Sequence, residues 1–550
     1  MTGTCPTLEE TRTRTRRHTM PGPRRCGLAP DDPGTRGPDM SEGFLRVGRR
    51  VGRWTGRGLC YGLIWLGLTL LAAGGIIRHY WGQISVGQMR MNLMSVQTDG
   101  GGGSVVWISV LVIGVLPVLV TVGIALARRA WLRRARREHG TRPPRGVVRS
   151  ASAVTVAAVF VAGSTSFASA VDLPQYVKAV KSPHDIGSTY VQPTITSDAD
   201  KRNLVVIYLE SGEATLADDQ LFEKNAFAPL EDVTRPEDGW RSVEDFQQYE
   251  GGGWTMAGIA STQCGIPLKE SGDAGSADIG AGQEQYLGGV TCLGDVLQNH
   301  GYTNTFLGGA NSSFAGKDTF LRSHGYTEDK GLEDWRAAGE PAENFRSDWG
   351  LSDERLMAHA KDEVDRLHAE SERTGQPFNL SMLTLDTHEP VHIYDSCNVD
   401  TQNQVTSVFA CSMTQVAGFV EHMKSQGYLE DTSVVIMGDH LKHMSAGDAF
   451  HEQLDHHPNR TVFNRVWIPG ETAGQPLRAG ADQLSMYPTL LEAAGLSVHD
   501  GAAGLGTSVR QQEPPQGSAQ AMDPEEYQQL LDSRSADFYS RAWDPENPVG

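Results

Sequence analysis

The stretch TSVVIMGDH, residues 432–440, is a continuous apolar run that ends in an aspartate and a histidine. Three other stretches contain the same kind of run: NLVVIYLES (203–211), TNTFLGG (303–309) and FNLSMLTLDTH (378–388). Short runs rich in Val, Ile and Leu are typical of strands that are buried on both faces of a parallel sheet. We therefore expect these four runs to be strands of one mostly parallel sheet.

Segments with helical spacing of apolar residues separate the predicted strands. They are CLGDVLQNHGY (292–302), LSDERLMAHAKDEVDRLHAES (351–371) and CSMTQVAGFVEHMKSQGY (411–428). The alternation of strands and helices predicts an α/β fold, in which helices flank the sheet on both faces. In such sheets, ligands bind beyond the carboxyl ends of the strands.

Three of the predicted strands end in side chains that can bind a metal ion. These side chains are Glu210, the pair Asp386 and His388, and the pair Asp439 and His440. A single acid at a strand end is ordinary, because acids begin loops and cap helices, so Glu210 alone is more simply structural. The convergence of three strand ends on carboxylates and imidazoles instead predicts a site for a divalent ion such as Mn²⁺, Mg²⁺ or Zn²⁺.

Thr255 lies in the stretch GGGWTMAGIASTQCGIPL, residues 251–268. A threonine hydroxyl bound to a cation can be deprotonated and attack phosphorus. Glycines allow a close backbone approach, and a helix that starts near Trp254 would direct peptide N–H groups toward an anion. The alternative is that Thr255 only caps this helix.

Charge is unevenly distributed along the chain of 550 residues. The formal net charge is −19, yet residues 1–150 carry an excess of arginine and residues 151–550 carry a large excess of acids. Nucleic-acid phosphates require a basic surface, so the acidic part argues against a nucleic-acid partner. The length exceeds what one core supports, which predicts a soluble domain and at least one further part.

Three apolar runs precede the predicted sheet. GLCYGLIWLGLTLLAAGGII (58–77) and VVWISVLVIGVLPVLVTVGIALA (105–127) carry no charge and have the roughly 20 residues that a membrane helix needs. Ser and Thr dilute the third run, ASAVTVAAVFVAGSTSFASA (151–170), for which a buried core helix is the alternative. Its position between an arginine-rich segment and a polar domain favours a third membrane helix.

Arginines give these runs an orientation. Residues before the first run and residues 128–149 are strongly basic, whereas residues 78–104 are nearly neutral. The positive-inside tendency places both basic segments in the cytoplasm and the chain after Ala170 outside a multi-pass protein of the cell membrane. The sequence ASA that ends at Ala170 fits a signal-peptidase site, so release after Ala170 is an alternative. Met40 is an alternative start to Met1.

These patterns divide the chain into five predicted segments. They are a disordered basic cytoplasmic tail (1–50), a membrane domain (51–171), a linker (172–200), an extracytoplasmic catalytic domain (201–510) and a polar C-terminal extension (511–550).

Four of the seven cysteines lie in the predicted outer domain. An even number fits an oxidising compartment. Proximity in the sequence suggests the disulfides Cys264–Cys292 and Cys397–Cys411, each expected to contribute on the order of 3 kcal/mol. A zinc site is the alternative, which the absence of CxxC spacing disfavours.

Several ordered blocks of the chain resemble the phosphoglycerol transferases of the alkaline phosphatase and sulfatase superfamily. The blocks are YLES, GWTMAGIASTQCGIPL, CLGDVLQNHGYTNTFLGGA, FAGKDTFLRSHGY, LTLDTHEP and GDHL. Within this family, the chain is most similar to the phosphoglycerol transferase I group of osmoregulated periplasmic glucans, and lipoteichoic acid synthases are more distant. The resemblance implies an alkaline phosphatase/sulfatase-like sheet flanked by helices, preceded by about three transmembrane helices.

The resemblance also implies roles for individual residues. In the family, a threonine nucleophile, a glutamate and an Asp-His pair hold one divalent cation, usually manganese. The matching residues here are Thr255, Glu210, Asp439 and His440. His388 matches a histidine that contacts the phosphate or the glycerol. Lys317 stands where lipoteichoic acid synthases have an arginine, a change that loses the bidentate fork but keeps the charge. The Cys/Ser motif of true sulfatases is absent around Thr255, which disfavours sulfate hydrolysis.

The implied reaction is a transfer in two steps. Thr255 takes the phosphoglycerol group from phosphatidylglycerol and passes it to an extracytoplasmic glycan or polymer acceptor. Alternatives are a metal-dependent phosphodiesterase, a phosphoethanolamine transferase, and a catalytically silent receptor or scaffold. The intact set of candidate ligands argues against a silent protein.

Overall fold

The computed structural model describes residues 40–89, 104–138, 145–271, 285–346, 349–443, 449–471 and 475–550. The chain divides into two compact units, Met1–Leu59 and Cys60–Gly550. Residues 1–39 of the predicted tail, with Cys5 and Cys26, lie outside the described residues. Helix α1 (Met40–Tyr80) already begins at Met40, so residues 40–50 are helical where we predicted disorder. The reason is that no proline interrupts this arginine-rich and leucine-containing segment.

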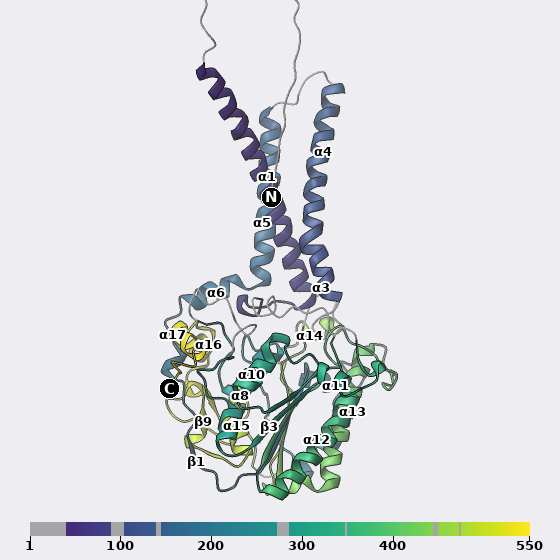
Figure 1. Ribbon diagram of the computed structural model, residues 1–550, viewed down its shortest axis with the longest axis vertical. Coiled ribbons are helices and arrows are strands. Elements are labelled where there is room, and N and C mark those ends of the chain that lie inside the picture. Colours follow the sequence, from purple (N-terminus) through teal and green to yellow (C-terminus); the bar gives the residue numbers. More distant parts are fainter. Residues whose placement is uncertain are drawn as a thin grey trace, which may run out of the picture. The chain divides into compact units, whose positions relative to one another are not determined.

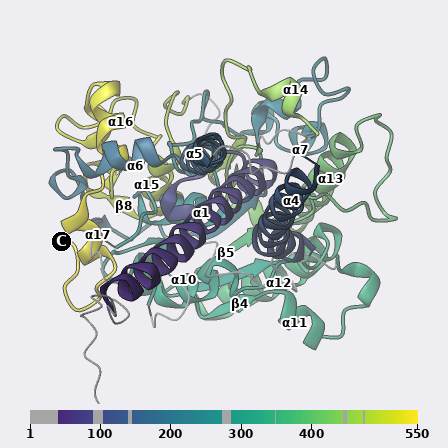
Figure 2. The ribbon, with the colours of Figure 1, turned by 90° about the horizontal axis from the view of Figure 1, so that it is seen from above.

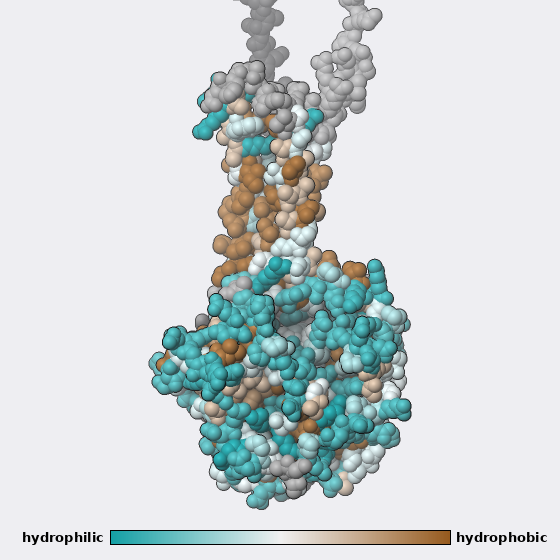
Figure 3. Space-filling view, turned by 180° about the vertical axis from the view of Figure 1, so that it is seen from behind, coloured by the Kyte–Doolittle hydropathy of each residue, from teal (hydrophilic) through white to brown (hydrophobic). Residues whose placement is uncertain are grey.

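Three helices are long and apolar enough to cross a membrane, judged by length and composition within the described residues. The first is Thr55–Tyr80, within α1. The second, Val105–Arg137, comprises α3 (Ser104–Ser109), the π-helical segment η1 (Val110–Val115) and α4 (Leu116–Glu138). The third, Val148–Ala170, belongs to α5 (Arg145–Ala170). Apolar side chains cover much of these helices in Figure 3.

The third run is not a buried core helix, because half of its twenty residues are exposed and only three are buried; Val154, for example, is 68% exposed. Two glycines bring α5 against α1: a Cβ on Gly163 would lie 2.0 Å from the carbonyl oxygen of Gly67. Figure 1 and Figure 2 show the two helices side by side. Close approach at small residues is how membrane helices commonly pack.

The predicted cleavage point after Ala170 lies in a folded turn. Ala170 is fully buried, and its carbonyl accepts a hydrogen bond from the amide of Ile84 at 3.0 Å. Ile77, Ile84 and Val171 form a small apolar cluster with it. A protease would therefore have to unfold this turn to reach the bond.

The predicted catalytic domain contains a six-stranded sheet in the order β4-β3-β5-β2-β6-β7. The strands are β4 (Glu328–Lys330), β3 (Thr303–Gly308), β5 (Phe378–Leu383), β2 (Asn203–Leu209), β6 (Thr432–Gly438) and β7 (Asn464–Trp467). All neighbours are parallel except β7, which pairs antiparallel with β6. The four strands predicted from apolar runs are confirmed. Two edge strands, β4 and β7, were not predicted.

Alternation along β2 shows why its whole run is apolar. Leu204, Val206 and Tyr208 pack into one core, and the residues between them pack into a second core on the other face of the sheet. The first core contains α8 (Thr255–Cys264), α9 (Leu293–Asn299), α10 (Lys317–Ser323) and α15 (Met486–Ala493). The second contains α7 (Ala228–Val233), α11 (Leu332–Ala337), α12 (Asp353–Thr374) and α13 (Gln404–Gln426). The α/β prediction is confirmed (Figure 1).

Smaller elements complete the described chain. The remaining strands form two pairs, β1 (Ile195–Ser197) with β8 (Ser497–Val498) and β9 (Ala502–Ala503) with β10 (Gly506–Thr507). The short helices are η2 (Ile186–Ser188), η3 (Ala214–Ala217), η4 (Pro236–Asp238), η5 (Phe314–Gly316), η6 (Ala342–Asn344), η7 (Tyr428–Glu430), α14 (His451–Leu454), η8 (Gln483–Ser485), η9 (His499–Gly501) and η10 (Ala519–Ala521).

Residues 511–550, predicted as a polar extension, are packed on the predicted catalytic domain. They contain α16 (Pro524–Asp532) and α17 (Ala536–Ala542). Leu530 and Tyr539 belong to the first core. The predicted linker 172–200 contains α6 (Leu173–Val180), which hydrogen-bonds to α16. Their polar composition reflects amphipathic helices that bury a few large side chains each.

Both predicted disulfides, Cys264–Cys292 and Cys397–Cys411, are present. The first joins the last residue of α8 to the residue that precedes α9. His324 lies beside this pair, but the disulfide leaves no thiolate for the alternative zinc site. The bond therefore fixes the C-terminal end of the helix that begins at Thr255.

Candidate active site

Two neighbouring strands bring the buried Glu210, Asp439 and His440 together. Leu209 pairs with Gly438 in the parallel ladder between β2 and β6, so the residues that follow are adjacent. Potential ligand atoms of Glu210, Asp439 and His440 all lie within 4.8 Å of one another. His440 Nε2 is 3.5 Å from a carboxylate oxygen of each acid.

Thr255 completes this group as the first residue of α8. Its hydroxyl donates a hydrogen bond to Glu210 Oε2 at 3.3 Å. Trp254 holds the N-cap position and makes no side-chain cap, so Thr255 is not the cap of α8. Gly258, one turn later, allows the helix to pack closely on the segment that carries Asp439 and His440: a Cβ there would lie 2.0 Å from the Asp439 carbonyl oxygen.

The geometry of the three buried residues fits a divalent cation. Asp439 Oδ1 accepts hydrogen bonds from the amides of Ser211 and His440, at 2.9 and 2.8 Å, whereas its buried Oδ2 has no hydrogen-bond partner among the described residues. An unsatisfied buried carboxylate oxygen is costly unless a cation or donor meets it. His440 Nδ1 donates to the Leu441 carbonyl at 2.7 Å, which leaves the Nε2 lone pair facing the carboxylates.

Electrostatics support the same interpretation. Burial and the charge of Glu210 raise the pKa of Asp439 to about 7. Burial lowers the pKa of His440, but the nearby Asp439 and Glu210 outweigh it and raise the pKa overall. Although burial raises the pKa of Glu210, His388 and His440 lower it below its usual value. The group therefore holds excess negative charge that it relieves by taking up a proton or a cation.

His388 follows β5 and is held by its surroundings. Its Nδ1 donates to the Glu389 carbonyl at 2.7 Å, and its ring packs on Trp349 with 4.0 Å between centroids. Arg346 donates to the His388 carbonyl at 3.1 Å. Burial lowers the pKa of His388 and outweighs the charge of Glu210, which acts to raise it. The lowered pKa favours the neutral ring.

Lys317 is the first residue of α10 and is buried. Its Nζ lies 5.6 Å from the centre of the Phe306 ring and has no hydrogen-bond or ion-pair partner among the described residues. Burial lowers the pKa of Lys317 to about 8, although the negative charges of Asp329 and Glu210 act to raise it. A buried ammonium without a partner is costly, so this position suits an anionic ligand.

Asp386, which also ends a predicted strand, does not join the metal group. Its carboxylate accepts a hydrogen bond from the amide of Asp353 at 3.0 Å, at the start of α12. Asp353 in turn accepts from the amides of Leu385 and Asp386. Asp386 is thus a structural residue that joins β5 to α12, as acids at helix starts commonly are.

Four residues around the site escaped sequence reasoning. Thr387 donates to the Glu210 carbonyl at 2.6 Å, Gln483 donates to the Asp439 carbonyl at 2.7 Å, and Ser211 donates to Glu210 Oε1 at 2.8 Å. Trp349 packs in a small apolar cluster with Ala310 and Leu385, and its ring also supports His388. Ser211 and Thr387 adjoin predicted ligands, which was an available signal, whereas Gln483 is remote in sequence.

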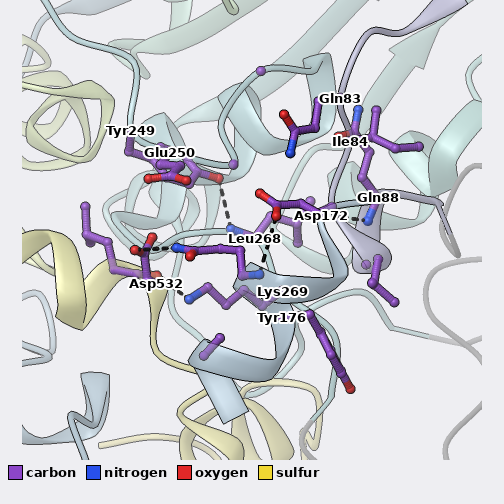
Figure 4. Close-up of a pocket in the computed structure, with 18 of the residues that line it drawn as sticks. Gln83, Ile84, Gln88, Asp172, Tyr176, Tyr249, Glu250, Leu268, Lys269 and Asp532 are labelled. Atoms are coloured by element: carbon purple, nitrogen blue, oxygen red, sulfur yellow. Dashed lines mark hydrogen bonds between the residues drawn. The ribbon is translucent and has the colours of Figure 1, made fainter. Parts of the chain in front are cut away.

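A cavity of 490 Å³ borders the segments that carry Thr255 and His440. Its lining includes Gly251 and Gly253, which precede Thr255, and Leu441, which follows His440. The other walls come from residues 81–88, α6, residues 268–271 and the end of α16. Figure 4 shows side chains from these separate segments gathered around one space. Its volume falls in the range of small-molecule sites.

Comparisons with known proteins agree with this geometry. The sulfatase family profile matches residues 203–496, more than half of the chain. Two curated relatives, phosphoglycerol transferase I of Escherichia coli and of Shigella boydii, are each 35% identical over 345 residues, covering 59% of this chain and 42% of the relative. The chain thus matches about two fifths of the length of these relatives.

Among solved structures, the lipoteichoic acid synthase LtaP of Listeria monocytogenes is similar with a TM-score of 0.49 and 16% identity. The match covers 66% of this chain and 97% of that one. The family assignment itself rests on the profile match and on the mixed sheet flanked by helices. The chain belongs to the sulfatase family, has the alkaline phosphatase/sulfatase-like fold, and is similar to the phosphoglycerol transferases I.

Proposed function

We propose that this protein is a membrane-anchored transferase that moves a phosphoglycerol group from phosphatidylglycerol to an extracytoplasmic glycan or polymer acceptor. The observation that carries the proposal is the Thr255 hydroxyl, 3.3 Å from a carboxylate of a buried cation-binding group and at the start of a helix. Similarity to phosphoglycerol transferases I supports the choice of transferred group.

Glu210, Asp439, His440 and Thr255 would hold one divalent cation. The resemblance suggests Mn²⁺, and Mg²⁺ or Zn²⁺ suit the same donors. When bound, this ion lowers the pKa of the threonine hydroxyl and neutralises charge on the phosphate oxygens.

Thr255 forms the covalent intermediate. Its Oγ loses a proton to water and bonds to phosphorus, while the bond from phosphorus to the diacylglycerol oxygen breaks. The diacylglycerol oxygen takes up a proton and diacylglycerol leaves. An acceptor hydroxyl then loses its proton and bonds to phosphorus, the bond to Oγ breaks, and Thr255 regains its proton.

Lys317 and His388 assist at the phosphate. Lys317 brings a buried ammonium whose Nζ has no hydrogen-bond or ion-pair partner within the described part of the chain, so it is free to neutralise a phosphate oxygen. His388, fixed by Trp349 and by the Glu389 carbonyl, presents its Nε2 to the phosphate or the glycerol. Arg346 holds the His388 backbone and thus positions the ring.

A membrane anchor suits this reaction. The lipid donor cannot leave the bilayer cheaply, and tethering the catalytic part beside it raises the local donor concentration. We place the catalytic part outside the cell membrane, because the arginine-rich segments flank the opposite ends of the spans.

Product identity tests the proposal. Full-length protein in lipid nanodiscs receives Mn²⁺ and phosphatidylglycerol labelled in the head group, with and without a cell-envelope glycan fraction. We expect diacylglycerol release and label in the glycan. Label found only as free glycerophosphate would indicate a phosphodiesterase. Turnover of phosphatidylethanolamine instead would indicate a phosphoethanolamine transferase, and no diacylglycerol from either lipid would refute the donor class.

A further inference from the structure

Helix α6 follows the third candidate span after a sharp turn. Helix α5 ends at Ala170, and Asp172 adopts a left-handed conformation (φ 43°, ψ 48°) that interrupts the helix. The Asp172 side chain then accepts a hydrogen bond from the amide of Gln175 and starts α6. In Figure 1, α6 runs across the direction of α5, and Figure 2 shows α5 end-on and α6 lengthwise. The chain therefore changes direction where the span ends.

One face of α6 is apolar and exposed. Leu173, Tyr176, Val177 and Val180 are 42, 38, 44 and 46% exposed. Their spacing of three, four and seven residues from Leu173 places them on one side of the helix. Outside the three spans, the described part of the chain exposes six large apolar side chains, and these four are among them. Such concentration on an eight-residue helix marks an interaction surface.

The opposite side of α6 is attached to the catalytic part. Two hydrogen bonds attach α6 itself: Gln175 Nε2 donates to Asp532 Oδ2 at 2.7 Å, and the amide of Arg534 donates to the Ala179 carbonyl at 3.2 Å. Two more attach the residues that follow α6: His184 Nε2 pairs with Gln529 Oε1 at 3.2 Å, and the amide of Ile186 donates to Ser535 Oγ at 2.8 Å. These bonds fix the rotation of the helix. Its apolar face cannot turn inward without breaking them.

We propose that α6 lies parallel to the plane of the bilayer, with its apolar face in the lipid headgroup region. Through its hydrogen bonds, it holds α16 and α17 close to the membrane surface. Continuity with α5 argues for lipid as the occupant of this face, because α6 begins three residues after the span ends. Eight residues are too few to cross the bilayer. Tyr176 suits the interface, and the exposed Lys178 and Lys181 suit anionic headgroups.

This placement has a consequence for the cavity beside the active site. Tyr176, Ala179 and Val180 line that cavity as well as belonging to α6. If α6 lies among the headgroups, this wall of the cavity stands at the level of the lipid phosphates. The position of α6 does not depend on the proposed reaction, because it follows from the exposure of α6, its attachment to α16 and its continuity with the third candidate span.

The depth of α6 in the bilayer can be measured by spin labelling of the full chain in nanodiscs. Cys5, Cys26 and Cys60 are first replaced by serine, and a nitroxide is attached to Val177→Cys or to Lys178→Cys. Lys178 is the matched control, because about 100° per residue places it away from the apolar face. We expect the label at 177 to collide several-fold more often with oxygen than with a water-soluble nickel chelate, and the label at 178 to show the reverse.

Two results would overturn the proposal. Equal access of both labels to the nickel chelate would place α6 in water, and shielding of the label at 177 from both reagents would indicate a protein contact, such as a second copy of the chain. A second variant tests the role of the face as a whole. With the label moved to Leu173→Cys, Val177→Asp is expected to reduce the oxygen preference several-fold, and an unchanged preference contradicts the inference. Thermal unfolding of each labelled chain controls for loss of fold.

Discussion

Gly258→Ala is expected to abolish most activity, although alanine is the better helix former. An alanine Cβ would lie 2.0 Å from the Asp439 carbonyl oxygen, and real Cβ contacts under 3.0 Å are essentially absent. The start of α8 must therefore move by about 1 Å relative to the segment that carries Asp439 and His440. A misplacement of about 1 Å at reacting groups can cost on the order of 10²-fold in rate.

A matched glycine separates this clash from a general effect of alanine. Gly418 lies inside α13, where a Cβ would meet only the flexible end of Lys361 at 3.6 Å. Gly418→Ala is expected to leave activity unchanged and to stabilise the protein by about 0.5–1 kcal/mol, because glycine is a poor helix former. Gly258→Ala is expected to destabilise it, since overpacking costs about 1–3 kcal/mol.

The assay is diacylglycerol release from phosphatidylglycerol in nanodiscs, with thermal unfolding measured on the same samples. The two variants should move in opposite directions in stability, and only Gly258→Ala should lose activity. If Gly258→Ala keeps activity within about twofold of the parent chain, α8 is not packed against the ligand segment as the structure indicates. The clash mechanism is then wrong.

Four further predictions concern single groups of the site. Thr255→Ala should remove turnover and the phosphoglycerol-modified Thr255 peptide that the mechanism predicts in mass spectra of the parent chain, with only about 1 kcal/mol lost from one hydrogen bond; Thr255→Ser should restore part of both. Mn²⁺ is expected to raise the unfolding temperature of the parent chain, by an amount that corresponds to about 2.7 kcal/mol at a hundredfold excess over Kd, and Asp439→Asn should abolish this rise. Lys317 is charged only below its pKa of about 8, so activity should fall as pH rises through about 8. In a pH–rate profile, Lys317→Arg should move this alkaline loss of activity to higher pH. Replacing Cys264 and Cys292 with serine should lower the free energy of unfolding by about 3 kcal/mol, measured by denaturant unfolding.

The strands that carry Glu210, Asp439 and His440 were predictable because their physical signal is local. A central parallel strand such as β2 must be apolar on both faces, and the first polar residue after it marks the carboxyl end of the sheet. Edge strands lack this signal. Strand β4 is the tripeptide EDK, whose side chains are half-buried and whose pairing comes from the backbone of β3. Nothing in its composition distinguishes it from a loop.

Residue roles were harder to predict, because they depend on partners that are remote in sequence. Asp386 and Asp439 both follow an apolar strand, yet one meets the start of α12 and the other meets Glu210. The difference arises from which helix packs over each strand end. Trp349 likewise gains its contact with His388 only when two loops fold together. Family resemblance, rather than pattern, separated the proposed ligands from the structural acids.

With one divalent cation bound, the charges of the site would suit a phosphodiester better than a phosphate monoester. Glu210 and Asp439 bring two negative charges, and Lys317 brings one positive charge whose Nζ lacks an ion-pair partner among the described residues. With one divalent cation, and before Thr255 loses its proton, the site would carry a single excess positive charge. A diester carries one negative charge near neutral pH and balances it, whereas a monoester carries nearly two and leaves an uncompensated charge in a buried site. The ammonium of Lys317 therefore supplies the excess positive charge: without it, the site with its cation would hold no net charge to balance that of a bound phosphodiester.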